Sequence, residues 1–209
     1  GHCRKAEWSV VPAELRDAER TASKSQQADD GEFSRKIDSQ DEDIGSRAVI
    51  RNARELVWYP SEVDTSIRTG WFYHPEEDTD VRTAGELLDI YLDAVGANAS
   101  LLLNIPPDTH GRIAAPDCAS LTELGTKIQQ IFASNVTEKA AITTDSAIAQ
   151  HPITQAVDGM ANTYWQAAYG QESDTITLNF PKPQKVSCVV LGEHLPTGQR
   201  IESGEIWAD

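Results

Sequence analysis

The chain has 209 residues, 39% of them hydrophobic, which is enough to bury the core of one large or two small domains. Its net charge of -15 at pH 7 disfavours nucleic acid and anionic membrane surfaces as partners, because both require a basic face. The longest apolar run, SLLLNI, is too short to cross a membrane. A neutral ligand such as a sugar is compatible with this composition.

Residues 17–43 contain almost no large apolar side chains beyond Phe33 and Ile37, and many of them are acidic. This composition predicts a solvated acidic insertion, either a loop or a loose helix. A lid over a site is an alternative interpretation, because long loops without a core of their own are often functional.

Strands and helices are expected to alternate after this insertion. Thr83 and Glu86 have the spacing of a capping box that opens a helix, and Gly96 ends the helix. The apolar run that follows, residues 99–105, predicts a strand covered on both faces. Residues 115–132 have the periodicity of another amphipathic helix. This order predicts parallel strands, as in a barrel of strands and helices.

Polar side chains are concentrated where the predicted strands end. Glu62 and Asp64 occupy alternate positions of one strand, so both side chains point to the same face, and Asn104 ends the next strand. In such barrels, polar groups at the carboxyl ends of strands form the site. Two carboxylates can perform acid–base chemistry. Hydrogen bonding to sugar hydroxyls, or pairing with Arg68, is the interpretation that we favour from the spacing.

Four ring-bearing residues follow the carboxylates, namely Trp71, Phe72, Tyr73 and His74. They could form a wall for a sugar face or a methyl group, because aromatic rings offer rigid apolar area with polar edges. The alternative is that at least two of the four belong to the core. For Trp71 both interpretations stay open.

The pattern changes near residue 134 to short alternating stretches separated by turns. TITLNF alternates apolar and polar side chains, and KVSCVVLGEH follows after a proline-rich turn. We therefore predict antiparallel strands of a sandwich or jelly roll over residues 134–209, with a domain boundary near residues 132–136.

No cofactor is expected. The chain lacks the GxGxxG, Walker, GxSxG and HExxH motifs, and its histidines lack the spacing of metal ligands. Cys3, Cys118 and Cys188 lie far apart and form no CxxC pair, so we expect ordinary thiols.

Several long segments resemble the α-L-fucosidases of glycoside hydrolase family 29, and most of all the branch that acts on α-1,3/1,4-linked fucose. They are EWSVVP, ELVWYPSEVDTSIRTGWFYHPEED, ELLDIYLDAVGANASLLLNIPPDTHGRI and DCASLTELG, in that order within residues 1–132. HPITQAVDGMANTYWQA and GQESDTITLNFPKPQ resemble a discoidin-type sandwich, similar to carbohydrate-binding family 32. The resemblance implies an α/β plus all-β fold, namely the C-terminal portion of a (β/α)8-like barrel followed by a partial antiparallel β-sandwich.

The resemblance also implies the activity of a retaining, exo-acting glycosidase that removes fucose from fucosylated oligosaccharides in a secreted or periplasmic location. In that family an aspartate is the nucleophile and a glutamate is the general acid and base. The opening GHCRKAEWSVVP resembles the sequence just after the Gly-Asn-Glu motif that carries this glutamate. We therefore expect no catalytic carboxylate in this chain. It would then be a fragment that needs the N-terminal half of the barrel and is inactive and aggregation-prone alone.

The residues that match the family motifs are candidates for substrate contact or for shaping the pocket: Glu62, Asp64, Arg68 and Trp71, with Trp8 as a further candidate. A different class of function stays open, a non-catalytic carbohydrate-binding or scaffold protein with a degenerate barrel, because binding and hydrolysis use most of the same contacts.

Calcium is an open alternative that we do not favour. Some relatives of the second segment bind it near DGxxxTxW, here Asp158–Trp165. Asp158 and Thr163 could supply oxygen ligands, but Met160 stands where aspartate often occurs, so we expect no bound metal.

Overall fold

The computed structural model describes residues 10–13 and 45–208. It consists of two compact units. The first unit comprises Gly1–Ile128 together with His194–Asp209, and the second comprises Gln129–Glu193. Within the described residues, no helix has both the length and the apolar character needed to cross a membrane.

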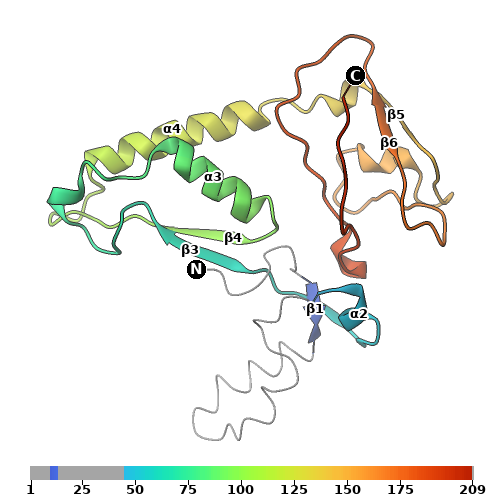
Figure 1. Ribbon diagram of the computed structural model, residues 1–209, viewed down its shortest axis with the longest axis horizontal. Coiled ribbons are helices and arrows are strands. Elements are labelled where there is room, and N and C mark those ends of the chain that lie inside the picture. The colour runs from blue at the N-terminus through green and yellow to red at the C-terminus, as the bar shows by residue number, and fades with distance from the viewer. Residues whose placement is uncertain (1–9, 14–44, 209) are drawn as a thin grey trace, which may run out of the picture. The chain divides into compact units, whose positions relative to one another are not determined.

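The first unit contains most of the regular structure (Figure 1). In chain order its elements are β1 (Val10–Pro12), α2 (Arg47–Ile50), β2 (Leu56–Trp58), β3 (Glu62–Ser66), η1 (Pro75–Glu77), α3 (Ala84–Val95), β4 (Ser100–Asn104), α4 (Ala115–Phe132) and η4 (Leu195–Thr197). β1 and β2 pair in antiparallel orientation.

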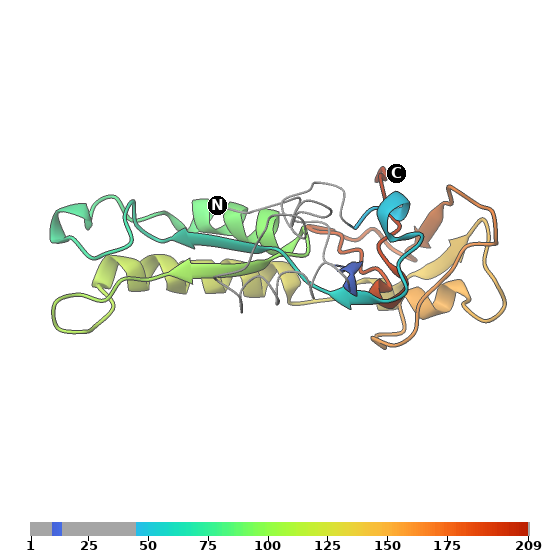
Figure 2. The same ribbon diagram turned by 90° about the horizontal axis from the view of Figure 1, so that it is seen from below.

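The pair β3–β4 is parallel, and the helix α3 connects its two strands. The register sets Glu62 opposite Ser100 and Ser66 opposite Asn104. Figure 2 shows the two strands side by side and running in the same direction. Since parallel neighbours need a crossover connection, the strand–helix–strand order that the sequence predicts is confirmed.

The helix α3 begins as its capping residues predict. Thr83 Oγ1 accepts a hydrogen bond from the Glu86 backbone N–H at 3.3 Å, and Glu86 Oε2 accepts one from the Thr83 backbone N–H at 2.8 Å. These two bonds satisfy amide groups that have no partner inside the helix. Gly96 is the C-cap residue, so both predicted ends of the helix are confirmed.

The core of the first unit lies between the β3–β4 pair and the helices α3 and α4, which cover the same side of the strands (Figure 1). Ile67, Leu87 and Leu124 are buried there, and Leu103 and Ile105 pack against them. Side chains alternate along a strand, so their neighbours in sequence point to the opposite face.

One expectation about β4 is wrong. The apolar run predicts cover on both faces, yet Leu102 is 52% exposed. The helices cover only one side of the strand pair, and the described residues supply no second layer for the other side.

The second unit contains η2 (Thr137–Lys139), β5 (Ala141–Thr144), η3 (Ile153–Ala156) and β6 (Ile176–Asn179). β5 and β6 form an antiparallel pair with Ile142 opposite Leu178, so the strand predicted from TITLNF is present over Ile176–Asn179, but its partner is a segment that the sequence pattern does not single out. Ile176 is 42% exposed, because no second sheet faces this pair within the described residues. The sandwich or jelly roll therefore stays a prediction.

The strand predicted from KVSCVVLGEH is wrong for this structure. Residues 185–194 form no strand, and Val190 is 72% exposed. A strand requires a hydrogen-bonding neighbour, and among the described residues β5 and β6 pair only with each other.

The end of the chain groups with the first unit, although the sequence assigns residues 134–209 to one domain. Leu195 and Pro196 line an apolar cleft together with Val10, Leu56, Val57 and Trp58. Arg47 forms an ion pair with Glu202 at 2.8 Å. These contacts attach the segment after Glu193 to the β1–β2 pair and to α2.

Candidate functional site

The face of the β3–β4 pair that points away from the helices carries the predicted polar residues. Glu62, Asp64 and Ser66 of β3 share this face with Leu102 and Asn104 of β4, because they alternate with residues that face the core. Glu62 is exposed and Asp64 is half-buried. The structure therefore brings the two predicted carboxylates and the predicted asparagine to one face. The expectation that the carboxylates lie at the carboxyl end of their strand is wrong for Glu62, which is the first residue of β3, whereas Asn104 is the last residue of β4.

A small network joins the carboxyl ends of the two strands to the loop after β3. Ser66 Oγ donates a hydrogen bond to the Gly70 carbonyl at 2.7 Å and accepts one from Asn104 Nδ2 at 3.2 Å. Asn104 Nδ2 also lies 3.0 Å from the Trp71 carbonyl, to which it donates. The backbone of the loop is thus held where it leaves the sheet.

Arg68 lies beneath this loop with no exposed side-chain surface. Its Nε donates to Asp117 Oδ2 at 3.1 Å and its Nη2 to Asp78 Oδ1 at 2.7 Å. Its Nη1 donates to the His74 carbonyl at 3.3 Å, and the guanidinium carbon lies 4.8 Å from the centroid of the Tyr73 ring. The guanidinium is therefore enclosed by the loop and by α4.

The charge of Arg68 is stabilised by its two carboxylate partners. Burial opposes the charged form, but the hydrogen bonds and charges of Asp78 and Asp117 outweigh this effect and raise the pKa of the guanidinium. In place of the pairing with Glu62 or Asp64 that the sequence suggests, the structure pairs Arg68 with Asp78 and Asp117. This position agrees with a role in shaping the pocket, and direct contact with substrate stays a prediction.

The four ring-bearing residues divide into two kinds. Trp71 is 50% exposed and Phe72 is 77% exposed, whereas Tyr73 is half-buried against Arg68. His74 is exposed, but its carbonyl is used by Arg68. Trp71, Phe72 and His74 are consequently the rings that could meet a ligand.

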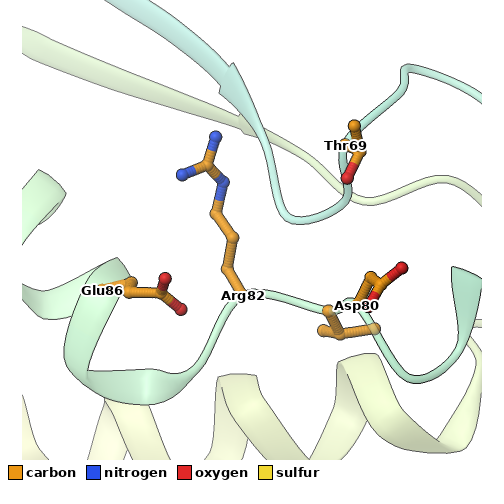
Figure 3. A pocket seen from close by; sticks show the side chains of 5 residues that line it. Thr69, Asp80, Arg82 and Glu86 are labelled. Carbon is orange, nitrogen blue, oxygen red and sulfur yellow. The ribbon is translucent and has the colours of Figure 1, made fainter.

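A shallow pocket lies where the same loop returns to α3, lined by Thr69, Asp80, Val81, Arg82 and Glu86. Figure 3 shows the Arg82 side chain extending from this pocket toward the end of β3. There its Nε donates to the Ser66 carbonyl at 2.9 Å. Since Glu86 caps α3, two charged groups of this pocket stabilise the loop and the helix.

The remaining predicted residues lie elsewhere. Trp8 and the acidic insertion are outside the described residues. Asp158 closes its own turn, because its Oδ1 accepts from the Met160 backbone N–H and from Thr163 Oγ1, both at 2.9 Å. Within the described ranges, no three His, Cys, Asp or Glu side chains are grouped so that they could hold a metal ion.

Asp78 and Asp117 are site residues that the sequence does not reveal. Asp117 occupies the first turn of α4, where an acidic residue commonly favours the helix dipole, so its type and position carry no further signal. It is fully buried and lies 49 residues from Arg68 in the sequence. Only the packing of α4 against the end of β3 brings the pair together.

A family model described as Alpha-L-fucosidase matches residues 16–130. Alpha-L-fucosidase 1 of Arabidopsis thaliana is 33% identical over 150 residues, which cover 70% of this chain and 29% of that relative. The chain therefore spans less than a third of the length of this curated relative.

Two solved structures are similar to the chain. A candidate α-L-fucosidase of Bacteroides thetaiotaomicron has a TM-score of 0.58 and 27% identity, covering 85% of this chain and 36% of its own. A GH29 fucosidase of Ruminococcus gnavus, solved in complex with fucose, has a TM-score of 0.52 and 31% identity, covering 57% of this chain and 24% of its own.

Proposed function

The chain belongs to the α-L-fucosidase family, and on this premise we propose that the whole protein is a glycosidase that removes terminal α-L-fucose from glycans. Two features that occur in the same region together support the proposal. The family model covers the β3–α3–β4–α4 region. This region presents the Asn104 amide and the exposed Trp71 ring near the carboxyl ends of parallel strands, and the Asp64 carboxylate lies on the same face of the strand pair.

We assign substrate binding to these side chains. Glu62 and Asp64 would accept hydrogen bonds from sugar hydroxyls. Trp71 would contact an apolar sugar face or the methyl group of fucose, since an indole offers flat apolar area. Arg68 would act indirectly by holding the loop. A neutral sugar suits a chain with a net charge of -15, because no charge has to be compensated.

The finer features of the reaction belong to the same proposal. We propose a retaining, exo-acting mechanism on α-1,3/1,4-linked fucose, with an aspartate nucleophile and a glutamate acid–base that are distinct from Glu62 and Asp64. A retaining glycosidase places its two catalytic carboxyl groups about 5–5.5 Å apart on either side of the scissile bond. The Glu62 and Asp64 side chains instead leave one strand on the same side, which suits binding of one ligand face.

Two features outside the barrel-like region complete the proposal. The second segment, residues 134–209, is proposed as a discoidin-type domain that contributes carbohydrate binding, and the antiparallel β5–β6 pair agrees with this architecture. The protein is proposed to act as a secreted or periplasmic enzyme, where glycans are accessible. Fractionation of the producing cells, followed by detection with an antibody to the chain, measures the location.

The activity is tested with the whole protein and 4-nitrophenyl α-L-fucoside. We expect hydrolysis, with the α-anomer of fucose as the first product in a proton NMR time course, and release from α-1,3- or α-1,4-fucosylated oligosaccharides before α-1,2-linked ones. Asp64→Asn should raise KM about tenfold with a smaller change in kcat, because it removes a binding contact. Asp89→Asn, an exposed position on α3, is the matched control.

Two results would contradict the proposal in different ways. Binding of L-fucose without any hydrolysis would favour the non-catalytic carbohydrate-binding alternative. Neither binding nor hydrolysis of any α-L-fucoside would exclude both functions. Release of the β-anomer first would reject the retaining mechanism while leaving the fucosidase activity in place.

A further inference from the structure

We infer that Asp117 and Asp78 are positioning residues for substrate binding: through the buried Arg68 they hold the loop of residues 69–78, and with it Trp71, in place beside the polar face of β3–β4. The consequence for substrate binding rests on the proposed function. The holding of the loop itself rests only on the contacts described here.

Arg68 and Asp117 form a buried ion pair. The side chains of Arg68 and Asp117 have no exposed surface. Asp117 Oδ1 has no hydrogen-bond partner within the described part of the chain, so the buried charge of this carboxylate depends on Arg68. Removal of Arg68 would leave the Asp117 charge buried and uncompensated. Neutralising Asp117 would leave the buried guanidinium with Asp78 as its remaining carboxylate partner and weaken its attachment to α4, so the local structure should open more readily.

The loop of residues 69–78 is attached near its beginning and in its later part. Its beginning is held by Ser66 and Asn104, which bind the carbonyls of Gly70 and Trp71. Its later part is held through Arg68, which binds the His74 carbonyl and the Asp78 carboxylate. The loop is therefore anchored through three of its backbone carbonyls and the Asp78 carboxylate, and Arg68 provides the connection to α4.

The loop presents exposed aromatic rings to solvent. The rings of Trp71 and Phe72 are exposed although the backbone beneath them is hydrogen-bonded. An exposed ring on a fixed backbone binds a ligand at lower entropic cost than the same ring on a mobile loop. Through Arg68, Asp117 thus holds the later part of the loop that carries Trp71 and Phe72, and it does so without touching a ligand, which distinguishes a positioning residue from a contact residue.

Arginine is required at the centre of this arrangement. Its planar guanidinium donates in three directions at once, to α4, to the Asp78 carboxylate and to the His74 carbonyl. A lysine ammonium is a compact point charge without this fork geometry, so it could not hold all three partners in the same way.

The test is proteolysis of Asp117→Asn in the whole protein. Trypsin cleaves after arginine, and in the wild type the Arg68–Thr69 bond is protected because the Arg68 side chain is buried. We expect cleavage at this bond, followed by mass spectrometry, to become at least about tenfold faster in the variant, since local opening governs such rates. Glu123→Gln, which removes an exposed charge from the same helix, is the matched control and should not change the rate.

The second readout is the kinetics of 4-nitrophenyl α-L-fucoside hydrolysis. Displacement of a binding loop predicts a KM about tenfold higher for Asp117→Asn with kcat within about twofold. Asp78→Asn should raise the cleavage rate and KM in the same direction but by less, because the Asp78 side chain is 38% exposed. If circular dichroism shows that Asp117→Asn does not fold, Asp78→Asn takes its place in the test.

The outcomes separate the inference from the proposed function. Unchanged cleavage at Arg68–Thr69 in both folded variants would overturn the holding role. Faster cleavage with unchanged KM would overturn the connection to substrate binding. If the wild type does not hydrolyse the fucoside, the proposed function fails, and the proteolysis still decides whether these carboxylates hold the loop.

Discussion

At the scale of single residues, Gly198 has a backbone conformation that few other residues could adopt. Its φ is 86°, in the left-handed region, and it is buried beside α2 and β2. A Cβ atom at this position would clash with the Ile50 Cδ1 atom and approach Leu56. Glycine therefore allows the segment after η4 to approach the β1–β2 region closely.

Gly198→Ala should lower the free energy of unfolding of the first unit by about 2–5 kcal/mol, the sum of a left-handed penalty of about 1–2 kcal/mol and an overpacking cost of about 1–3 kcal/mol. Urea denaturation followed by tryptophan fluorescence measures this change. Gly170→Ala isolates the backbone penalty, because Gly170 has a φ of 84° and no atom lies within 4 Å of the added Cβ. Gly192→Ala is the second control, because this position has neither a left-handed φ nor an atom within 4 Å of the added Cβ. An effect at Gly198 no larger than that at Gly192 would contradict the explanation.

At the scale of elements, the end of β5 in the second unit is stabilised by one carboxylate. Asp174 Oδ1 accepts hydrogen bonds from Thr144 Oγ1 and from the Asp145 backbone N–H at 3.1 Å, and its Oδ2 accepts one from Ser146 Oγ. Ser146 also receives the Trp165 indole N–H on its carbonyl at 3.0 Å. The segment before β6 is thereby connected to the turn after β5.

The pKa of Asp174 sets the pH at which this connection is lost. Burial raises the pKa, but the hydrogen bonds from Ser146 and Thr144 outweigh it, so the pKa in the folded state is lower than 3.8. A depressed folded-state pKa contributes stability that is present above the unfolded value and disappears as the pH falls through the folded value.

Asp174→Asn should therefore destabilise the second unit at pH 7 by about 1–3 kcal/mol, the cost of weakening a charged acceptor of several hydrogen bonds. The difference from the wild type should narrow below about pH 4, where the wild-type carboxylate also loses its charge. Thermal unfolding between pH 3 and pH 7 measures both effects, with the exposed Asp145→Asn as control. A difference independent of pH would contradict the assignment to the carboxylate charge.

At the scale of the whole molecule, a large negative charge coexists with exposed apolar side chains in both units. The chain carries a net charge of -15, yet Trp58 is 69% exposed, Leu102 is 52% exposed and Val190 is 72% exposed. Exposed apolar side chains favour association between molecules, and charge repulsion counteracts it.

The 209-residue chain studied by itself should therefore self-associate, and more strongly as salt screens its charge above about 0.15 M. Leu102→Asn should reduce the association, because it places a polar side chain on the uncovered face of β4. Analytical ultracentrifugation over a range of concentrations measures the mass. Leu92→Asn, at an exposed position on α3, is the control. A wild-type chain that stays monomeric at every salt concentration would contradict this prediction.

Features that depend on short stretches could be predicted from the sequence alone. The capping box at Thr83 and the end of α3 at Gly96 use hydrogen bonds within a few residues. The alternation that sets Glu62 and Asp64 on one face is a property of any strand, and the strand Ile176–Asn179 follows from the alternation in TITLNF. The family itself was recognisable from long motifs in order.

Only the tertiary structure decided which distant groups meet and which apolar surfaces are covered. Asp117 becomes a partner of Arg68 because α4 packs against the end of β3, which no local pattern encodes. The exposure of Leu102, and the absence of a strand in residues 185–194, depend on whether a second layer or a neighbouring strand is present. Periodicity specifies the face that a side chain occupies, whereas contacts between remote segments specify what that face meets.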